Sequence, residues 1–287
     1  MTEKLRIGFI GAGRVAKALT LALSRAGESV VAVASRTRAS AEACAASIPG
    51  CEIMDDAQAV VDCAQLVFLA VPDDTIATLV ADLHWRAGVM VVHCSGATEL
   101  SALELAKAAG AKIGSFHPLL MFADCEVAAR ALPQSAIALE AEEPLLGLLE
   151  VLVRKLGAQS LFVPPGARAA YHAASHYGAA FLCVLLDQGM KIFDSVGMHG
   201  DASRKALLSL ARGTLAALDH SEPAHAMAGV YARGDAGTAR RHLQALDAID
   251  PDIAAFYREL ARRSIALAQE ADRIDPASAD LLREQLR

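Results

Sequence analysis

Residues 5–16 read Leu-Arg-Ile-Gly-Phe-Ile-Gly-Ala-Gly-Arg-Val-Ala, which is a short apolar strand followed by a turn of small residues. Gly11, Gly13 and Ala16 occupy the small positions of a G-x-G-x-x-A turn, and a helical apolar pattern begins at Val15. The first glycine allows the sharp bend, the second lets the backbone approach a pyrophosphate, and the third small residue lets the helix pack on the strand. The free N–H groups at the start of that helix favour phosphate. The stretch therefore predicts a dinucleotide site, and a purely structural glycine turn is the alternative.

The end of the second predicted strand, residues 29–34, indicates which dinucleotide binds. An NAD site normally has Asp or Glu there, which accepts hydrogen bonds from the ribose 2′-hydroxyl. This chain has Ser35-Arg36-Thr37-Arg38 instead, and Arg36 can bind a 2′-phosphate through two hydrogen bonds. We therefore predict NADP(H) rather than NAD(H), the alternative being that both arginines are solvated loop charges. The predicted cofactor contacts are Gly11, Ala12, Gly13, Arg14, Val15, Ser35, Arg36, Thr37, Val71, Pro72 and Asp73.

The composition is typical of a globular protein that acts on small molecules. The chain has 287 residues, is 54% hydrophobic and carries a net charge of −6, which argues against nucleic-acid and anionic-membrane binding. No apolar run is long enough to span a bilayer, and no signal-peptide pattern precedes the first strand. The cysteines are scattered without a C-x-x-C pair, so they predict thiols in a reducing cytoplasm and no metal site.

Two regions of different pattern divide the chain. Up to residue 163 apolar strands alternate with helices, which predicts an α/β Rossmann domain with a doubly wound, mostly parallel sheet. The further strands are expected at 64–71, 89–93, 112–117, 137–139 and 160–163. Pro164-Pro165-Gly166 reads as a linker, and only helical patterns follow it. We predict an NADP-binding domain over 1–163 and an all-helical domain for substrate binding and dimerisation over 164–287.

One predicted helix of the second domain is apolar on almost every side. It spans residues 167–196, and such a helix is normally buried all round. The helical domain is too small to enclose it alone, so we predict a homodimer in which the second subunit covers it. Enclosure within a single chain is the alternative.

Two polar residues follow strands of the predicted sheet, where ligands of open parallel sheets bind. His117 ends the strand at 112–117, and Ser95 follows the strand at 89–93. Hydride transfer to or from a C–O or C–N centre needs a proton donor or acceptor beside it, and histidine titrates in the useful range. We expect His117 to handle the proton and Ser95 to hydrogen-bond to the substrate or the nicotinamide. A structural hydrogen bond is the alternative for His117.

The helical region contributes further candidates. His172 and His176 lie one helical turn apart on one face, and we expect them at the substrate in the cleft between the domains. The same spacing can bind a metal, but no acid accompanies it, so no metal is predicted. Arg233 is expected to bind an anionic group of the substrate while Asp235 caps the helix that follows. A surface Arg–Asp pair is the alternative.

Several of these motifs resemble a known family. The similarity spans nearly the whole chain and rests on residues 8–16, 71–74, 93–96, 115–119, 171–174, 232–235 and 238–243. These segments resemble an uncharacterised bacterial family of Rossmann-like oxidoreductases with a helical domain of unknown function, within the broad 6-phosphogluconate dehydrogenase type. The resemblance implies a Rossmann domain, an all-helical domain and redox chemistry. One residue departs from that family, since Ala180 stands where its long helix usually has Asn.

A more distant resemblance concerns prephenate dehydrogenase. His117-Pro118-Leu119 is similar to its His-Pro-Met motif, and Ser175-His176 is similar to its Ser-His-Leu-Pro motif. This similarity implies that His117 contacts a substrate hydroxyl and that His176 lies in the substrate pocket. The chain departs from that family because no proline follows Ser175-His176 and no lysine follows Ser95.

Together these features predict an NADP(H)-dependent oxidoreductase that acts on a small anionic substrate at the cleft between two domains. Two alternatives stay open at this point. One is a protein that binds NADPH as a sensor or regulator without catalysis, because function lies in the site and not in the fold. The other is a dehydrogenase of the prephenate type.

Overall fold

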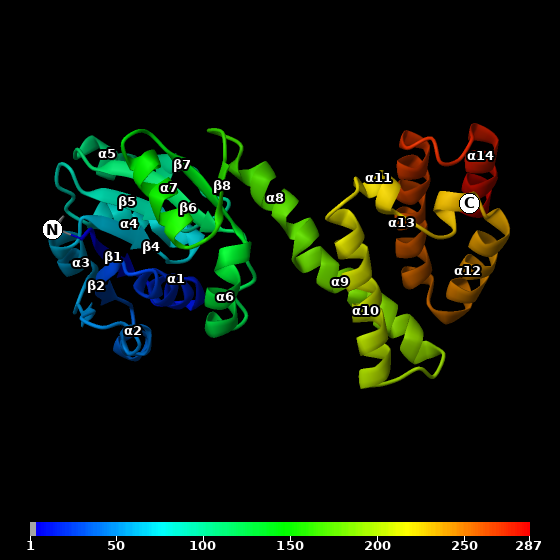
Figure 1. The fold of residues 1–287 in the computed structure, drawn as a ribbon, viewed down its shortest axis with the longest axis horizontal. Coiled ribbons are helices and arrows are strands. Elements are labelled where there is room, and N and C mark those ends of the chain that lie inside the picture. Colours follow the sequence, from blue (N-terminus) through cyan, green and yellow to red (C-terminus); the bar gives the residue numbers. More distant parts are fainter. Residues whose placement is uncertain (1–3) are drawn as a thin grey trace. The chain divides into compact units, whose positions relative to one another are not determined.

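The computed structural model describes residues 4–287 and contains one eight-stranded sheet (Figure 1). In chain order its strands are β1 (Arg6–Ile10), β2 (Ser29–Ala34), β3 (Glu52–Ile53), β4 (Leu66–Leu69), β5 (Met90–His93), β6 (Lys112–Pro118), β7 (Ala136–Ala141) and β8 (Gln159–Phe162). The order across the sheet is β3-β2-β1-β4-β5-β6-β7-β8. The chain direction along the sheet therefore reverses between β1 and β4, and ligands of such folds bind beyond the strand ends at this reversal.

The sheet is mostly parallel, which confirms the predicted fold class. All pairs from β3 to β6 are parallel, whereas β7 runs antiparallel to β6 and β8 lies parallel to β7. The two strands at that edge therefore run against the rest. Antiparallel neighbours need no crossover, and the connection between β6 and β7 carries only α6 (Cys125–Ala131) and a short turn.

Helices cover both faces of the sheet, and the alternation along β1 shows why. Ile7 and Phe9 point into a core that includes α1 (Arg14–Arg25) and α7 (Leu145–Lys155), and Phe9 stacks on Phe68 at 4.8 Å. Ile10 points to the opposite face. That second core is formed with α3 (Ala57–Cys63), α4 (Ile76–Asp82) and α5 (Glu104–Ala108). Apolar strands covered on both faces are typical of parallel sheets.

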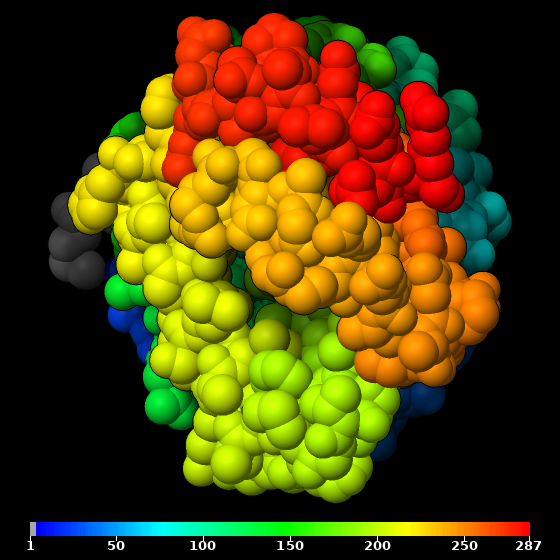
Figure 2. Space-filling view, turned by 90° about the vertical axis from the view of Figure 1, so that its right-hand side faces the viewer, coloured from blue at the N-terminus to red at the C-terminus, as the bar shows by residue number. Residues whose placement is uncertain are grey.

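The chain forms two compact units, Met1–Ala179 and Ala180–Arg287. The first contains the sheet, α2 (Arg38–Ala45) and α8 (Arg168–Gly178), so α8 packs with the sheet although it lies beyond the domain boundary placed at residue 163. The second is all-helical, as predicted, with α9 (Ala180–Ser195), α10 (Asp201–Leu218), α11 (Pro223–Ala226), α12 (Ala236–Ile249), α13 (Pro251–Glu270) and α14 (Pro276–Gln285). Leu243, Ile265 and Leu282 form the centre of its core. In Figure 2, a hollow lies between the yellow-green and the orange parts of this unit.

The prediction of one long helix over 167–196 is wrong. Ala179 leaves the helical conformation with φ −124° and ψ −95°, so the segment forms α8 and α9. Burial on every side is also wrong for the single chain, because α9 has no buried residue. Phe181 and Val184 on this helix are 46% and 47% exposed. An apolar pattern predicts that a helix is covered, but it does not say which chain covers it.

Several short elements lie outside the sequence prediction. β3 has two residues and α3 has seven, which is too short for a periodic pattern to stand out. α6, α11 and α14 were also not predicted from the sequence. Within residues 4–287, no helix combines the length and apolar character needed to cross a membrane. The cysteines in this part of the chain are all free thiols.

Candidate functional site

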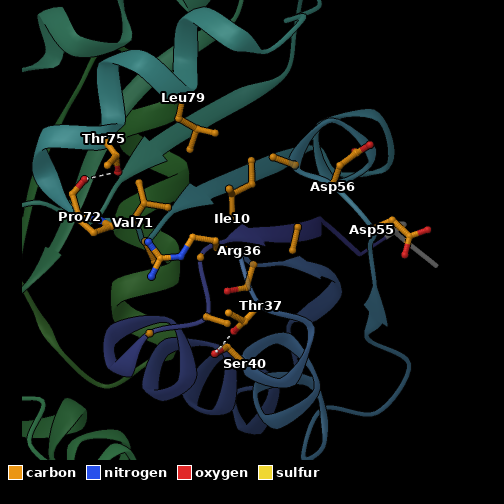
Figure 3. Close-up of a pocket in the computed structure, with 17 residues that line it drawn as sticks. Ile10, Arg36, Thr37, Ser40, Asp55, Asp56, Val71, Pro72, Thr75 and Leu79 are labelled. Atoms are coloured by element: carbon orange, nitrogen blue, oxygen red, sulfur yellow. Dashed lines mark hydrogen bonds between the residues drawn. The ribbon is translucent and has the colours of Figure 1, made fainter.

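A cavity of about 660 Å³ lies at the reversal of the sheet, beyond the carboxyl ends of β1, β2 and β4 (Figure 3). It is lined by the predicted contacts Gly11, Ala12, Gly13, Ser35, Arg36, Thr37, Val71 and Pro72. The further lining residues are Ile10, Ala34, Ser40, Asp55, Asp56, Ala57, Ala70, Thr75 and Leu79. Arg14, Val15 and Asp73, which we also predicted as contacts, are not part of this lining.

Glycine is needed at the two positions of the turn for different physical reasons. Gly11 has φ +100°, and a Cβ there would lie 2.3 Å from the carbonyl oxygen of Ala70, so the close approach of two loops requires glycine. At Gly13 no protein atom lies within 4 Å of the Cβ position. Gly13 precedes the first residue of α1, whose start has no side-chain cap and no acidic residue in its first turn. The amides of that turn are therefore left for an anionic ligand.

Arg36 is the charged group of this cavity that has no protein partner. Within the described part of the chain it makes no hydrogen bond and no ion pair, and its side chain extends into the pocket beside Val71 (Figure 3). Thr37 and Ser40 also line the cavity, and the Thr37 hydroxyl donates to that of Ser40 at 2.7 Å. Ser40 was missed from the sequence, although its position three residues after Thr37 at the start of a helix is a usable signal.

Arg38, the first residue of α2, differs from Arg36 because it is paired with acidic side chains. Its Nε lies 3.2 Å from Glu42 and its Nη1 lies 3.3 Å from Asp55. Asp55 lines the cavity but faces this arginine, and Asp56 accepts a hydrogen bond from the Ala59 amide as the cap of α3. Both acids are thus engaged elsewhere. They follow β3, and they were missed because that strand was missed.

A second cluster of polar side chains lies where β6 meets α8. His117 Nδ1 and the Tyr171 hydroxyl share a hydrogen bond of 2.7 Å. The ring centres of His117 and His172 are 5.9 Å apart, and those of His172 and His176 are 4.8 Å apart. The structure therefore brings together the three predicted histidines. Tyr171 was not among the predicted site residues, and its place directly before His172 was the available signal.

The environment of this cluster keeps His117 and Tyr171 uncharged. Burial lowers the pKa of His117 to about 4, and the neighbouring His172 and Arg168 add to the shift. Burial raises the pKa of Tyr171 to about 12 while Arg168 opposes that change. At neutral pH His117 is therefore a neutral imidazole and Tyr171 keeps its proton. The Nε2 of His117 makes no hydrogen bond with a described residue and is the ring nitrogen available to a ligand.

Gly96 and Ser95 form the turn beneath these rings. A Cβ at Gly96 would lie 2.5 Å from the His172 ring and 2.8 Å from the His117 ring, so only glycine fits. The Ser95 hydroxyl accepts from the amides of Ala97 and Thr98 and lies 2.8 Å from the Thr98 hydroxyl. These bonds close a Ser-type turn. The contact predicted from Ser95 to a substrate or nicotinamide stays a prediction.

His93 lies deeper in the sheet. Its side chain is fully buried, and neither ring nitrogen makes a hydrogen bond with a described residue. Burial lowers its pKa to about 3, the charges of Arg168 and His117 add to this, and the Ser95 backbone offsets a little of it. His93 is therefore a neutral core residue beneath the cluster.

Arg233 and Asp235 belong to the helical unit. Asp235 accepts a hydrogen bond of 2.9 Å from the Thr238 amide and so caps α12, as predicted. Arg233 ends a short 3₁₀ turn and is exposed, and no ion pair joins it to a described residue. In the part of the chain described, no three His, Cys, Asp or Glu side chains are grouped so that they could hold a metal ion.

Comparison with known families agrees with this architecture. Residues 1–118 match the Rossmann-like domain, and residues 135–264 match a domain of unknown function, DUF2520. The chain joins a Rossmann-like domain to a DUF2520 domain. This confirms the resemblance to Rossmann-like proteins with a helical domain of unknown function. No curated protein shows significant similarity to the chain.

Solved structures share the fold at low identity. Protein TM1727 from Thermotoga maritima is 19% identical, with a TM-score of 0.74 over 92% of this chain and 99% of its own. Protein BF3122 from Bacteroides fragilis is 22% identical, with a TM-score of 0.72 over 92% of this chain and 98% of its own. A reductive aminase from Aspergillus terreus, in complex with NADPH and ethyl-5-oxohexanoate, is 15% identical, with a TM-score of 0.62 over 99% and 93%. At such identities the similarity concerns the fold.

Proposed function

We propose that this protein is an NADP(H)-dependent oxidoreductase that transfers a hydride to or from a small anionic substrate. The observation that carries the proposal is Arg36, which follows the end of β2 and has no hydrogen-bond or ion-pair partner among residues 4–287. An NAD site would have an acid at this strand end. The proposal assigns NADP binding to the domain predicted over residues 1–163.

The cavity residues fit the parts of NADP(H). The start of α1 and the turn from Gly11 to Gly13 would hold the pyrophosphate, because free amides and a positive helix end face it. Arg36, with the hydroxyls of Thr37 and Ser40, would hold the 2′-phosphate. When bound, the reduced cofactor supplies a hydride. The A. terreus reductive aminase, which has the same fold, is known in complex with NADPH.

We propose that His117 transfers the proton that accompanies hydride transfer. A neutral imidazole carries one ring proton, and the partner of Nδ1 decides where it lies. When the Tyr171 hydroxyl donates to Nδ1, the proton is on Nε2, which can donate it to a substrate oxygen or nitrogen as that atom gains electrons. Nδ1 takes the Tyr171 proton as Nε2 releases its own, and a proton from solvent then restores the half-buried Tyr171 hydroxyl. The reverse sequence serves oxidation. His172 and His176 continue this surface along α8 and are proposed to contact the substrate.

Arg233 is proposed to bind the anionic group of the substrate. It is exposed, and the residues of the described chain give it no ion-pair partner, so its charge is open to a carboxylate or phosphate. Asp235 supports it by ordering the start of α12.

We also propose a homodimer. Apolar side chains gather on the exposed faces of α9 and α10, among them Phe181, Val184, Leu185, Leu210 and Leu215. Large exposed apolar surfaces are rare on monomers and mark interaction sites. A second copy that covers these helices would restore the burial that the sequence pattern of this segment predicts.

Titration of the protein with NADPH and with NADH, followed by fluorescence and calorimetry, tests the cofactor. We expect NADPH to bind more tightly, and equal affinity for the two would contradict the assignment. A screen of 2-oxo acids, aldehydes and imines for NADPH oxidation then tests catalysis. Binding of NADPH without turnover of any compound would favour the non-catalytic sensor, and reduction of NADP⁺ with prephenate would favour the prephenate-type reading.

A further inference from the structure

Arg168, in the first turn of α8, is fully buried yet charged. Its Nη1 donates to the Ser115 hydroxyl at 2.6 Å and to the Glu140 carboxylate at 3.1 Å, and its Nη2 donates to the Ser95 carbonyl oxygen at 2.6 Å. The Glu140 side chain is only 9% exposed. One guanidinium group thus joins β6, β7 and the turn after β5. A buried charge is tolerated only with partners of this kind.

The backbone of the same residue is held as well. The Glu99 carboxylate accepts hydrogen bonds from the amides of Arg168 and Gly166, each at 3.2 Å. The turn from Ser95 to Glu99 therefore binds Arg168 through both its side chain and its main chain. Less than one helical turn later, Tyr171 meets His117.

We propose that Arg168 is the positioning residue of the His117–Tyr171 pair. It anchors α8 on the sheet, and its positive charge, partly offset by the Glu140 carboxylate, acts on the pair. The catalytic meaning of this role rests on the proposed function. A nearby cation disfavours a second positive charge and favours a group that gains negative charge. The site is therefore built for a carbonyl oxygen that becomes an alkoxide, rather than for a protonated imine.

The effect of the Arg168 charge on the pKa of His117 can be distinguished from the effect of burial. The charge of Arg168 lowers the pKa of His117, of His93 and of Tyr171, although burial is the larger cause at each of the three. The titratable or charged groups near the pair are Arg168, Tyr171 and His172 from α8, His93 from β5, Glu140 from β7 and Glu99 from the turn. Removing Arg168 together with Glu140 deletes the cation and leaves no unpaired buried charge.

The test is a histidine titration by NMR on the full-length protein without cofactor. The His117 signal is assigned by its loss in His117→Gln, and its pKa is measured in the wild type, in R168M/E140M and in R168Q/E140Q. Replacing both members of a buried ion pair by apolar residues often preserves folding. If R168M/E140M does not fold, R168Q/E140Q still removes both charges and retains amide groups that can form hydrogen bonds. Ser115→Ala is the matched control, because it removes one bond to Arg168 and leaves the charge.

We expect a charge-free pair to raise the pKa of His117 by less than one pH unit, since Arg168 lowers this pKa whereas Glu140 is not among the groups that shift it. Ser115→Ala should leave it unchanged. A folded charge-free variant whose His117 titrates as in the wild type would overturn the proposal, and so would a Ser115→Ala shift of equal size. NADPH binding to the wild type is measured in a separate titration. If NADPH does not bind, the proposed function is refuted, but the measured effect of Arg168 on the pKa of His117 still stands.

Discussion

Replacing Arg36 by alanine is the sharpest test of the cofactor site. Arg36 has no protein partner among the described residues, so its removal leaves no acid uncompensated and disturbs no ion pair. The expected effect is therefore confined to the ligand. A hydrogen bond to a charged group contributes about 1.5–3 kcal/mol, which corresponds to a roughly 10- to 150-fold weaker Kd for NADPH.

The assay is titration of the wild type and the variant with NADPH and with NADH at one salt concentration. NADH lacks the 2′-phosphate, so its Kd should change little. Arg38→Ala is the matched control in the same loop, because that guanidinium already faces Glu42 and Asp55. We expect it to change NADPH affinity by less than about threefold, since exposed ion pairs contribute little. An NADPH Kd that is the same in Arg36→Ala and the wild type would refute the reasoning.

Four further predictions follow from the same structure. Gly96→Ala should lower the unfolding free energy by about 1–3 kcal/mol, because its Cβ would lie 2.5 Å from the His172 ring, and a melting temperature equal to that of the wild type would contradict the packing. The pKa of His117 is lowered to about 4, so the neutral ring contributes stability that is fully present above pH ~6.5 and is lost as the pH falls toward 4. This contribution to the free energy of unfolding is about 3 kcal/mol. His117→Gln should therefore flatten the pH dependence of chemical unfolding. Light scattering should give the mass of two 30.0 kDa chains, and Phe181→Glu with Leu185→Glu should give one; a wild-type monomer at micromolar concentration would exclude the dimer. In matched cyclic probes, NADPH oxidation should be faster with the ketone than with the protonated imine, and the opposite order would contradict the field assigned to Arg168.

The cofactor half of the site could be predicted from the sequence because it is local. Gly11, Gly13 and Arg36 lie within the first strand–helix–strand unit, where the spacing of small residues determines the turn and the strand end determines the 2′ contact. The alternation of apolar strands and helices likewise predicts a parallel sheet. The two acids after β3 were not predicted because that strand is too short for a periodic signal. Ser40 was also not predicted, although it stands three residues after Thr37 at the start of a helix.

The cluster around His117 is formed by contacts between parts of the chain that are distant in the sequence. His117 was recognised by its place at a strand end, but its bond to Tyr171 joins residues 54 positions apart. The bonds of Arg168 to Ser115 and Ser95 span 53 and 73 positions. An apolar pattern in the sequence indicates that a residue is buried, but it does not indicate which residues it contacts. A buried arginine in a helical segment therefore cannot be recognised from the sequence.

The sequence by itself determined the strand–turn–helix of the dinucleotide site, the parallel sheet and the helical second region, because each depends on dihedral preferences and apolar spacing over a few neighbouring residues. Only the tertiary structure decided that β7 runs against β6, that the long apolar segment breaks at Ala179, and that Arg168, Tyr171 and His117 meet. Those features depend on which surfaces pack together, and packing is a property of the whole chain that no local stretch encodes.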